Sequence, residues 1–345
     1  MLGNKSQFQN RLIRWYHTHA RDLPWRRTRD PYKIWVSEVM LQQTQVDTVI
    51  PYYEKWMERF PTLLALAEAP LSEAMKLWAG LGYYRRVRML HEGACYIVKN
   101  LSGTLPRQME GLLKLPGIGR YTAGALMSIA FGQKVPILDG NVIRIITRTH
   151  AIDADVQKFK TLELLWHISE TLVPAKVPGD FNQAMMELGA TVCFPENPLC
   201  AKCPVRKHCA AHAKREETVY PVKGHRVITQ TKQTAALICW RGREVLLQKQ
   251  PQDGRWGGLW MFPHWESEKR MLQETGFRTP QLKRKMTVQH SFTKFRIQLS
   301  VFESLLPYRP PVAVESRWVS LENLKDYAFP SPHLKIVGEL TQHAR

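Results

Sequence analysis

The sequence predicts two domains of different class, an all-α domain followed by a smaller mixed α/β domain. Residues up to about 215 carry helical periodicity with frequent helix starts and stops and few β-rich runs. Four of the six cysteines are bunched between 193 and 209, near the end of that region. A polar and basic stretch at 216–232 is typical of a linker, and β-type runs follow it. We therefore expect domains at 1–215 and 233–345.

The composition points to a polyanionic partner. The 345 residues carry a formal net charge of +19, which favours nucleic acid. A membrane is the weaker explanation, because no apolar run approaches the ~20 residues that span a bilayer. No signal-peptide pattern follows Met1, so bunched cysteines indicate a metal site before disulfides. The expected compartment is the reducing cytoplasm.

The first informative helix begins at Asp30 and Pro31, a favourable N-cap and first helical residue. Glu38 lies about two turns further on, among apolar neighbours that disfavour its ionised form and suit it to general acid catalysis. An isolated glutamate would more simply form an ion pair at the surface. The polar run Gln42-Gln43-Thr44-Gln45 at the helix end favours contact with base edges or a duplex stack instead.

An aromatic and basic turn, LGYYRRVR, follows at 81–88. A glycine turn with two tyrosines and three arginines combines a stacking wedge with phosphate contacts. Ordinary packing of Tyr83 and a solvated arginine face are the alternatives. Given the net charge, we favour DNA contact for the group as a whole.

The stretch 115–141 has the pattern of a helix-hairpin-helix followed by an acidic loop. Gly117 and Gly119 can open backbone N–H groups at the start of an apolar helix, which suits a DNA phosphate. Asp139 then precedes the next helix, either as a catalytic carboxylate or simply as an N-cap. Hairpins of this type also occur in proteins that only hold DNA.

The bunched cysteines have the spacing C-x6-C-x2-C-x5-C, formed by Cys193, Cys200, Cys203 and Cys209. Four thiolates this close can hold a [4Fe–4S] cluster or a single zinc. The longer gaps do not fit the paired C-x2-C pattern of a zinc ribbon. Basic residues within the loop also suit a phosphate backbone.

These motifs resemble the DNA glycosylase superfamily that includes endonuclease III and, over nearly the whole chain, the MutY family of adenine DNA glycosylases. The segments that carry the resemblance are WVSEVMLQQTQV (35–46), LWAGLGYYRR (77–86), LPGIGRYTAG (115–124), ILDGNV (137–142), FNQAMMELGA (181–190) and the four cysteines. The segment GGLWMFP (257–263) resembles the Nudix-related domain of these enzymes. The resemblance implies a helix-hairpin-helix glycosylase domain with one [4Fe–4S] cluster, followed by an α/β Nudix-like domain.

The resemblance also implies a reaction, hydrolysis of the N-glycosidic bond of an adenine mispaired with 8-oxoguanine or guanine in double-stranded DNA. The adenine must leave the base stack to be reached. Glu38 would protonate it and Asp139 would stabilise the cation left on the sugar, a division of labour seen in glycoside hydrolysis. The further residues it implies are Tyr121 and Asn141 at the sugar, Arg26 and Gln183 at the adenine, and Gln42, Gln43 and Tyr83 in the duplex. A monomer on DNA is expected.

Position 121 separates two related activities. Endonuclease III enzymes carry a lysine directly after the LPG-x-G-R turn, and its amine forms a Schiff base with the sugar. Tyr121 cannot do so, which predicts a monofunctional glycosylase. An endonuclease III-like glycosylase and lyase acting on oxidised pyrimidines is the alternative among enzymes. A DNA-binding iron–sulfur protein without catalysis is the alternative outside them.

The C-terminal domain raises a further hypothesis, a nucleotide pyrophosphohydrolase. A Nudix box needs several acidic residues to hold Mg²⁺, but the matching stretch at 269–277 keeps only Glu274 of three. We therefore expect the domain to recognise the lesion. In the MutY family a Phe-Ser-His loop does this, and here the matching residues are Phe292, Thr293 and Lys294. The lysine in place of the imidazole leaves the degree of preference for 8-oxoguanine over guanine open.

Overall fold

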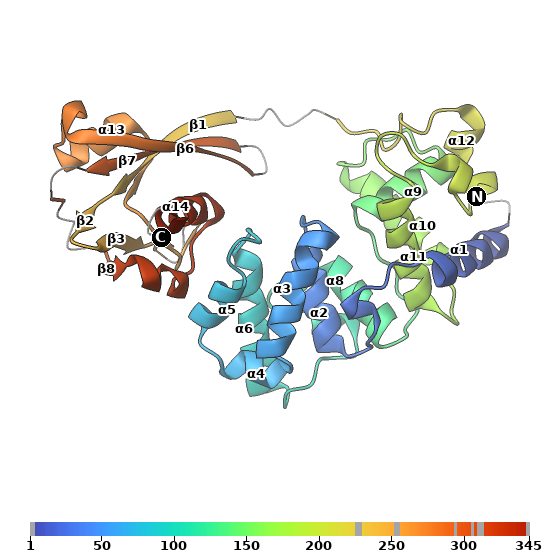
Figure 1. The fold of residues 1–345 in the computed structure, drawn as a ribbon. Coiled ribbons are helices and arrows are strands. Elements are labelled where there is room, and N and C mark those ends of the chain that lie inside the picture. The colour runs from blue at the N-terminus through green and yellow to red at the C-terminus, as the bar shows by residue number, and fades with distance from the viewer. Residues whose placement is uncertain are drawn as a thin grey trace. The chain divides into compact units, whose positions relative to one another are not determined.

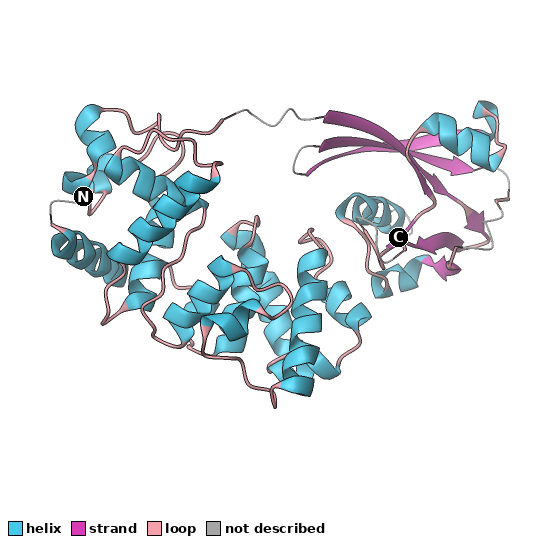
Figure 2. Cartoon of the chain, turned by 180° about the vertical axis from the view of Figure 1, so that it is seen from behind, coloured by secondary structure: helices cyan, strands magenta, loops and turns pink. Residues whose placement is uncertain are grey.

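The computed structural model describes residues 4–224, 230–251, 256–292, 295–304, 307–308 and 314–342. Contacts divide the chain into two compact units, one formed by 1–68 with 89–226 and the other by 69–88 with 227–345. The described residues of the first unit are helical, whereas the second contains the strands (Figure 2). The expected order, a helical part and then an α/β part, is confirmed.

The first unit is built from helices joined by short turns (Figure 1). Its α-helices are α1 (Lys5–His19), α2 (Pro31–Leu41), α3 (Val46–Arg59), α4 (Leu63–Glu68), most of α6 (Arg85–Asn100), α7 (Met109–Leu113), α8 (Arg120–Ala125), α9 (Gly140–His150), α10 (Phe159–Leu172), α11 (Pro178–Thr191) and α12 (Ala210–Lys214). Shorter helical turns are η1 (Pro24–Arg26), η2 (Leu126–Ala130), η3 (Cys200–Lys202) and η4 (Arg206–His208).

Capping residues set the start of the two helices that matter most for the site. The Asp30 side chain accepts from the backbone N–H of Tyr32 at the start of α2, and Asp139 accepts from that of Val142 at the start of α9. Each bond satisfies a donor that the helix itself leaves unpaired. The helix after the hairpin continues from α8 through a π-helical turn, η2, rather than as one regular α-helix.

One hydrophobic core cluster of this unit lies between α1, α9, α10 and α11. Its buried side chains include Phe8, Leu12, Ile145, Ile146, Leu165, Phe181 and Leu188. The helices α11 and α9 approach closely at Gly189, where an added Cβ would lie 2.5 Å from Cβ of Asn141. Glycine is therefore required there to seat the start of α9 against α11.

Part of the stretch expected as a linker packs on the helical unit. The backbone N–H of Val156 donates to the Val222 carbonyl at 3.0 Å, and Arg148 Nε donates to the Tyr220 carbonyl at 3.2 Å. Tyr220 itself is buried. Residues 216–224 are thus held in place, and the next element begins at residue 230.

The second unit contains two small sheets. The first has the order β5-β1-β7-β6 and the second joins β2, β3 and β4, with β8 pairing to β3. The pair β1–β7 is parallel and the other pairs are antiparallel. The strands are β1 (Gln230–Ile238), β2 (Trp240–Arg241), β3 (Glu244–Lys249), β4 (Trp260–Met261), β5 (His264–Trp265), β6 (Leu282–Phe292), β7 (Phe295–Ser304) and β8 (Ser316–Ser320).

Two helices, α13 (Glu268–Thr275) and α14 (Ser331–Gln342), cover opposite faces of the first sheet. Ala236 of β1 packs in the cluster that contains Ile336 of α14, whereas its neighbour Leu237 packs with Met271 of α13. Successive side chains of a strand point to opposite faces, so the apolar run of β1 serves two cores. The turns η5 (Thr279–Gln281) and η6 (Leu321–Asp326) complete the unit.

The segment 69–88 groups with this second unit, although the sequence placed it in the helical domain. It contains α5 (Leu71–Leu77) and the aromatic turn. Lys76 forms an ion pair with Asp326 at 2.9 Å, and the Tyr84 hydroxyl donates to the Phe329 carbonyl at 2.8 Å. These bonds join residues about 250 positions apart in the chain, so no local pattern could predict them.

Candidate active site

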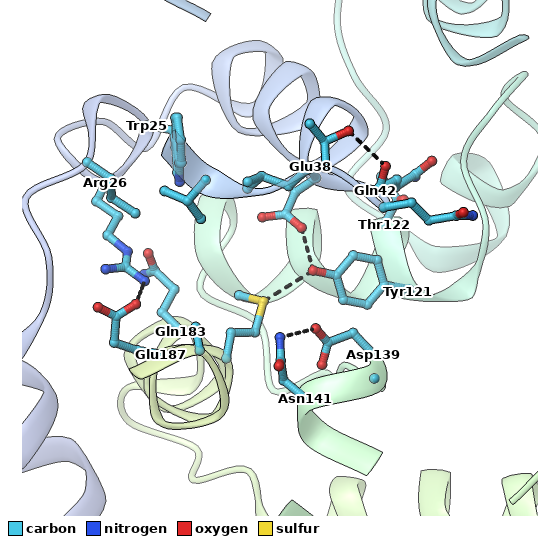
Figure 3. A pocket seen from close by; sticks show the side chains of 18 of the residues that line it. Trp25, Arg26, Glu38, Gln42, Tyr121, Thr122, Asp139, Asn141, Gln183 and Glu187 are labelled. Atoms are coloured by element: carbon cyan, nitrogen blue, oxygen red, sulfur yellow. Dashed lines mark hydrogen bonds and ion pairs between the residues drawn. The ribbon is translucent and has the colours of Figure 1, made fainter. Parts of the chain in front are cut away.

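A pocket of about 750 Å³ opens in the helical unit (Figure 3). Its walls come from η1, α2, the first turns of α8 and α9, and α11. The predicted residues that line it are Arg26, Glu38, Gln42, Gln43, Gly119, Tyr121, Asp139, Asn141 and Gln183. Segments separated by more than 100 residues in the sequence therefore meet at one site.

Glu38 lies on α2 and is 4 % exposed. Because most of this helix is buried, its carboxyl has little contact with water. Burial raises the pKa of Glu38 to about 7, with a smaller rise from nearby Asp139 and an opposing effect of the hydrogen bond from Tyr121. A carboxyl that is neutral up to about pH 7 can deliver a proton to a bound base.

Tyr121, in the first turn of α8, holds the Glu38 carboxylate. Its hydroxyl donates to Glu38 Oε2 at 2.6 Å, and Met186 Sδ lies 3.1 Å away as a second acceptor (Figure 3). Burial, followed by the two neighbouring carboxylates, raises the pKa of Tyr121 well above its ordinary value of 10. The side chain is thus a neutral phenol and a hydrogen-bond donor throughout the physiological range.

Asp139 combines the N-cap of α9 with a position in the pocket. Its Oδ1 accepts from the Val142 N–H at 2.8 Å and its Oδ2 from the Asn141 side-chain amide at 3.0 Å (Figure 3). Burial raises the pKa of Asp139, while these donors and the Arg144 guanidinium act in the opposite direction. The two interpretations from sequence, cap and pocket carboxylate, are therefore compatible.

Glu187 was not singled out from the sequence, yet its side chain is fully buried at the pocket wall. Arg26 Nη2 donates to it at 2.7 Å and Arg21 Nη2 at 2.8 Å. The only available signal was its spacing, since Glu187 lies four residues after Gln183 on α11 and shares its face. The apolar side chains of the lining were also missed, namely Leu23, Trp25, Leu41, Val46, Met186 and Ala190.

Two residues whose side chains are expected to contact the duplex have a rare backbone conformation. Gln43 has φ 58° and Tyr83 has φ 50°, a region that residues other than glycine seldom adopt. Arg86 stacks on the Tyr83 ring at 5.4 Å and donates to the Gly82 carbonyl at 3.1 Å, which fixes the turn. Tyr83 is 40 % exposed and belongs to the second unit.

The hairpin glycines lie where the sequence placed them. Gly117 has φ 78° and an added Cβ would lie 2.9 Å from Met89 Cβ, and Gly119 is the N-cap of α8. The expected lesion loop lies at the β6–β7 turn, where the backbone of Phe292 pairs with Phe295. The Phe292 side chain and the whole of Thr293 and Lys294 lie outside the described residues.

The four cysteines expected to bind a cluster line one small pocket beyond α11, which is where Cys193, Cys200, Cys203 and Cys209 converge. Burial raises the pKa of the Cys203 thiol to about 12. Arg148 Nη1 lies 3.2 Å from Cys193 Sγ and offers a positive charge to a thiolate. Four soft sulfur donors around one space fit an iron–sulfur cluster and do not fit a hard cation.

Comparisons with known proteins place both parts of the chain. Residues 36–171 match the model of the HhH-GPD superfamily of base excision DNA repair proteins, and residues 234–339 match the NUDIX domain model. The adenine DNA glycosylase of Homo sapiens is 37 % identical to this chain over 97 % of it and 74 % of the human protein. The chain belongs to the adenine DNA glycosylase family. It is thus a DNA N-glycosylase of base excision repair, as the motifs predicted.

An adenine DNA glycosylase from a bacterium matches over nearly its full length. This protein, from Buchnera aphidicola subsp. Acyrthosiphon pisum (strain APS), is 33 % identical over 96 % of each chain. Among solved structures, a thermostable thymine-DNA glycosylase has a TM-score of 0.56 and 33 % identity, covering 61 % of this chain and 97 % of that one. An endonuclease III–DNA complex, at TM-score 0.52 and 23 % identity over 61 % of this chain and 98 % of that one, shares the fold. Among the described residues no helix is long and apolar enough to cross a membrane.

Proposed function

We propose that this adenine DNA glycosylase hydrolyses the N-glycosidic bond of an adenine placed opposite 8-oxoguanine or guanine in double-stranded DNA. The observation that carries the proposal is the buried Glu38 carboxyl, which Tyr121 holds in a pocket that also contains Asp139. The opposite base is inferred from the motif likeness described above.

Glu38 is the general acid in this proposal. The departing adenine carries negative charge unless a ring nitrogen is protonated, and a donor with a pKa near neutrality is the most effective at the working pH. Burial gives Glu38 a pKa of about 7. The base must be extruded from the stack to reach it, at a cost of a few kcal/mol that a mispair reduces.

Asp139 stabilises the positive charge that develops on the sugar. Its carboxylate is oriented by Val142 and Asn141, so little reorganisation is needed when the charge appears. Two carboxyl groups around one glycosidic bond, one acting as the acid and the other as the anion, are the arrangement used in glycoside hydrolysis. The water that completes the reaction can be deprotonated by Glu38 once it has lost its proton.

The adenine pocket is formed by side chains from η1 and α11. Gln183 and Arg26 supply hydrogen-bond donors, and Glu187 fixes the Arg26 guanidinium. Trp25 contributes a flat apolar surface for a purine. Gly117 and Gly119 bind a phosphate with their N–H groups, while Gln42, Gln43 and Tyr83 contact the duplex.

Tyr121 makes the enzyme monofunctional. Strand cleavage by a glycosylase needs an amine that attacks the sugar to form a Schiff base. The pocket lining contains arginines but no lysine among the described residues. Release of adenine is therefore expected to leave an intact strand with an abasic site.

The cysteine loop holds one [4Fe–4S] cluster, with Cys193, Cys200, Cys203 and Cys209 as ligands. Such a cluster would stabilise a loop whose regular structure between the cysteines is limited to two short helical turns, η3 and η4. Iron and sulfide analysis of the purified protein should give four of each per chain. Zinc in place of iron and sulfide would refute this assignment.

The Nudix-like part contributes recognition of the opposite base. Glu274, its remaining box acid, accepts from Arg270 Nε at 2.7 Å and from Trp265 Nε1 at 2.9 Å. This carboxylate is therefore occupied within the domain. The loop Phe292-Thr293-Lys294 is the proposed contact with the oxidised guanine.

The proposal is tested by single-turnover incubation with a duplex that holds one adenine opposite 8-oxoguanine. Half of each sample is then heated in alkali, which cleaves abasic sites. Cleavage only after alkali is expected, and cleavage without alkali would show that an amine acts in place of the absent lysine. A duplex with guanine opposite the adenine gives the relative preference.

Asp139→Asn separates catalysis from binding. Asparagine is also a good N-cap, so the start of α9 should be kept. Loss of base release with unchanged DNA affinity is expected. Unchanged base release would remove Asp139 from the mechanism.

A further inference from the structure

Met186 occupies a position in the pocket that the proposed mechanism leaves unexplained. It lies on α11 between Gln183 and Glu187, and its sulfur is 3.1 Å from the Tyr121 hydroxyl. In Figure 3 two dashed lines meet at the Tyr121 hydroxyl, one from Glu38 and one from the yellow sulfur. The adjacent Met185 is buried in the apolar core instead. The chain thus places one of two consecutive methionines against an active-site hydroxyl.

A phenol has one proton to donate and an oxygen that can also accept. When Glu38 is ionised, Tyr121 donates to it, which is the 2.6 Å bond of the structure. When Glu38 is protonated, its own O–H can donate to the Tyr121 oxygen only if the phenol proton turns elsewhere. The thioether of Met186 is the acceptor within reach.

We propose that Met186 is a positioning residue for the proton of the general acid. Its sulfur accepts the Tyr121 proton whenever Glu38 is protonated, and this turns Tyr121 from a donor into an acceptor. The protonated carboxyl is then held in a hydrogen bond until adenine enters. Met186 thereby favours the form of Glu38 that can act, and a side chain without an acceptor would disfavour it.

Electrostatics around the site agree with this arrangement. A donor fixed on a carboxylate favours its ionised form, and the Tyr121 bond does oppose the rise that burial gives to the pKa of Glu38. The other ionisable side chains of the pocket are Arg21, Arg26, Arg120, Asp139, Arg144 and Glu187. Replacing Met186 adds or removes none of these charged groups. A changed titration of Glu38 would therefore report on the sulfur.

The inference rests on the proposed roles of Glu38 and Tyr121. It is tested with Met186→Leu, which keeps the volume and removes the acceptor. Met185→Leu is the matched control, because it makes the same chemical change one residue away in the core. Single-turnover adenine release is measured for each full-length, cluster-loaded protein from about pH 5 to about pH 9.

In Met186→Leu the Tyr121 proton stays on Glu38, so the alkaline limb of the profile should move to lower pH. A shift of about one pH unit makes release roughly tenfold slower on the alkaline side and leaves the acid side unchanged. Met185→Leu should keep the wild-type midpoint. Met186→Gln, whose amide oxygen is an acceptor on a chain of similar length, should restore it.

A profile for Met186→Leu that is lowered uniformly without a shift would overturn the inference, because that is the result of a packing defect. So would a shift of the same size in a Tyr121→Phe background, where no phenol proton exists. Should the leucine variant fail to fold, a wild-type midpoint in Met186→Ala would equally refute the proposal. If Glu38→Gln retains full activity, the proposed function itself has failed.

Discussion

Arg144 donates from Nε to the Cys193 carbonyl at 2.7 Å and from Nη2 to the Asn141 side-chain oxygen at 2.8 Å. Cys193 is the first of the four cysteines, and the Asn141 amide in turn donates to Asp139. One arginine, only 8 % exposed, therefore joins the cysteine loop to the carboxylate proposed to face the sugar. A continuous chain of hydrogen bonds thus joins the loop to Asp139.

Replacing this arginine by lysine should slow adenine release. Lysine keeps the charge but loses the planar fork that bonds both partners. A hydrogen bond to a charged group contributes roughly 1.5–3 kcal/mol, so losing its alignment should slow release roughly 10- to 100-fold. Single-turnover rates and iron content are measured together for Arg144→Lys. Arg241→Lys, at an exposed ion pair with Glu244, is the control. A wild-type rate would show that the connection does not orient Asp139.

Adenine release should fall as pH rises through about 7. Glu38 acts in its protonated form, and burial raises its pKa from 4.5 to about 7. The active fraction is complete well below the folded pKa and declines about tenfold per pH unit above it. Rate profiles of the wild type and Glu38→Gln check this. The variant should be slow and flat, and an equally steep variant profile would assign the titration to another group.

The same pKa shift predicts an effect on stability. Between pH 4.5 and about 7 the folded state binds more protons at Glu38 than the unfolded state does. The contribution of Glu38 to the free energy of unfolding therefore falls as pH rises through this window. Urea unfolding should show the wild type losing stability relative to Glu38→Gln between these values. A constant difference would contradict the assigned pKa.

The parts of the site that sequence could predict are those with local signals. Asp30 and Asp139 cap the helices that directly follow them, and the cysteine spacing lies within one short loop. Glu187 escaped prediction because its partner Arg26 is 161 residues away. Segment 69–88 groups with the second unit, and one of the bonds it makes there, from Tyr84, spans 245 positions. Such pairings leave no periodicity or spacing in the chain.

A methyl group at Gly189 should damage the site by displacing Asn141, the side chain that orients Asp139. The added Cβ would lie 2.5 Å from Cβ of Asn141, well inside contact distance, so the start of α9 must move. Overpacking of this kind costs about 1–3 kcal/mol. Gly189→Ala is expected to lower both the unfolding free energy and the rate of adenine release. The control is Gly338→Ala on α14, where nothing lies within 4 Å of an added Cβ. Equal behaviour of the two variants would mean that α9 adjusts without loss.

Removing the charge of Glu187 should weaken both the fold and the adenine pocket. Burial alone raises the pKa of this carboxyl, but the donations from Arg21 and Arg26 outweigh it and bring the pKa to about 2. In Glu187→Gln two guanidinium groups lose their counter-charge. Breaking a buried pair costs roughly 3–5 kcal/mol, and we expect about 2 kcal/mol because Arg21 is 35 % exposed.

The pH dependence gives this last prediction its sharpest check. A carboxyl with a lowered pKa stabilises the fold above its unfolded value of 4.5, and this contribution is lost as pH falls towards about 2. The stability gap between the wild type and Glu187→Gln should therefore close on acidification. The control is Asp22→Asn, which breaks the exposed ion pair with Arg27 in the segment that also carries Arg21 and Arg26. It should leave the free energy of unfolding unchanged at neutral pH. If the gap persists at low pH, the loss in Glu187→Gln comes from packing and not from charge.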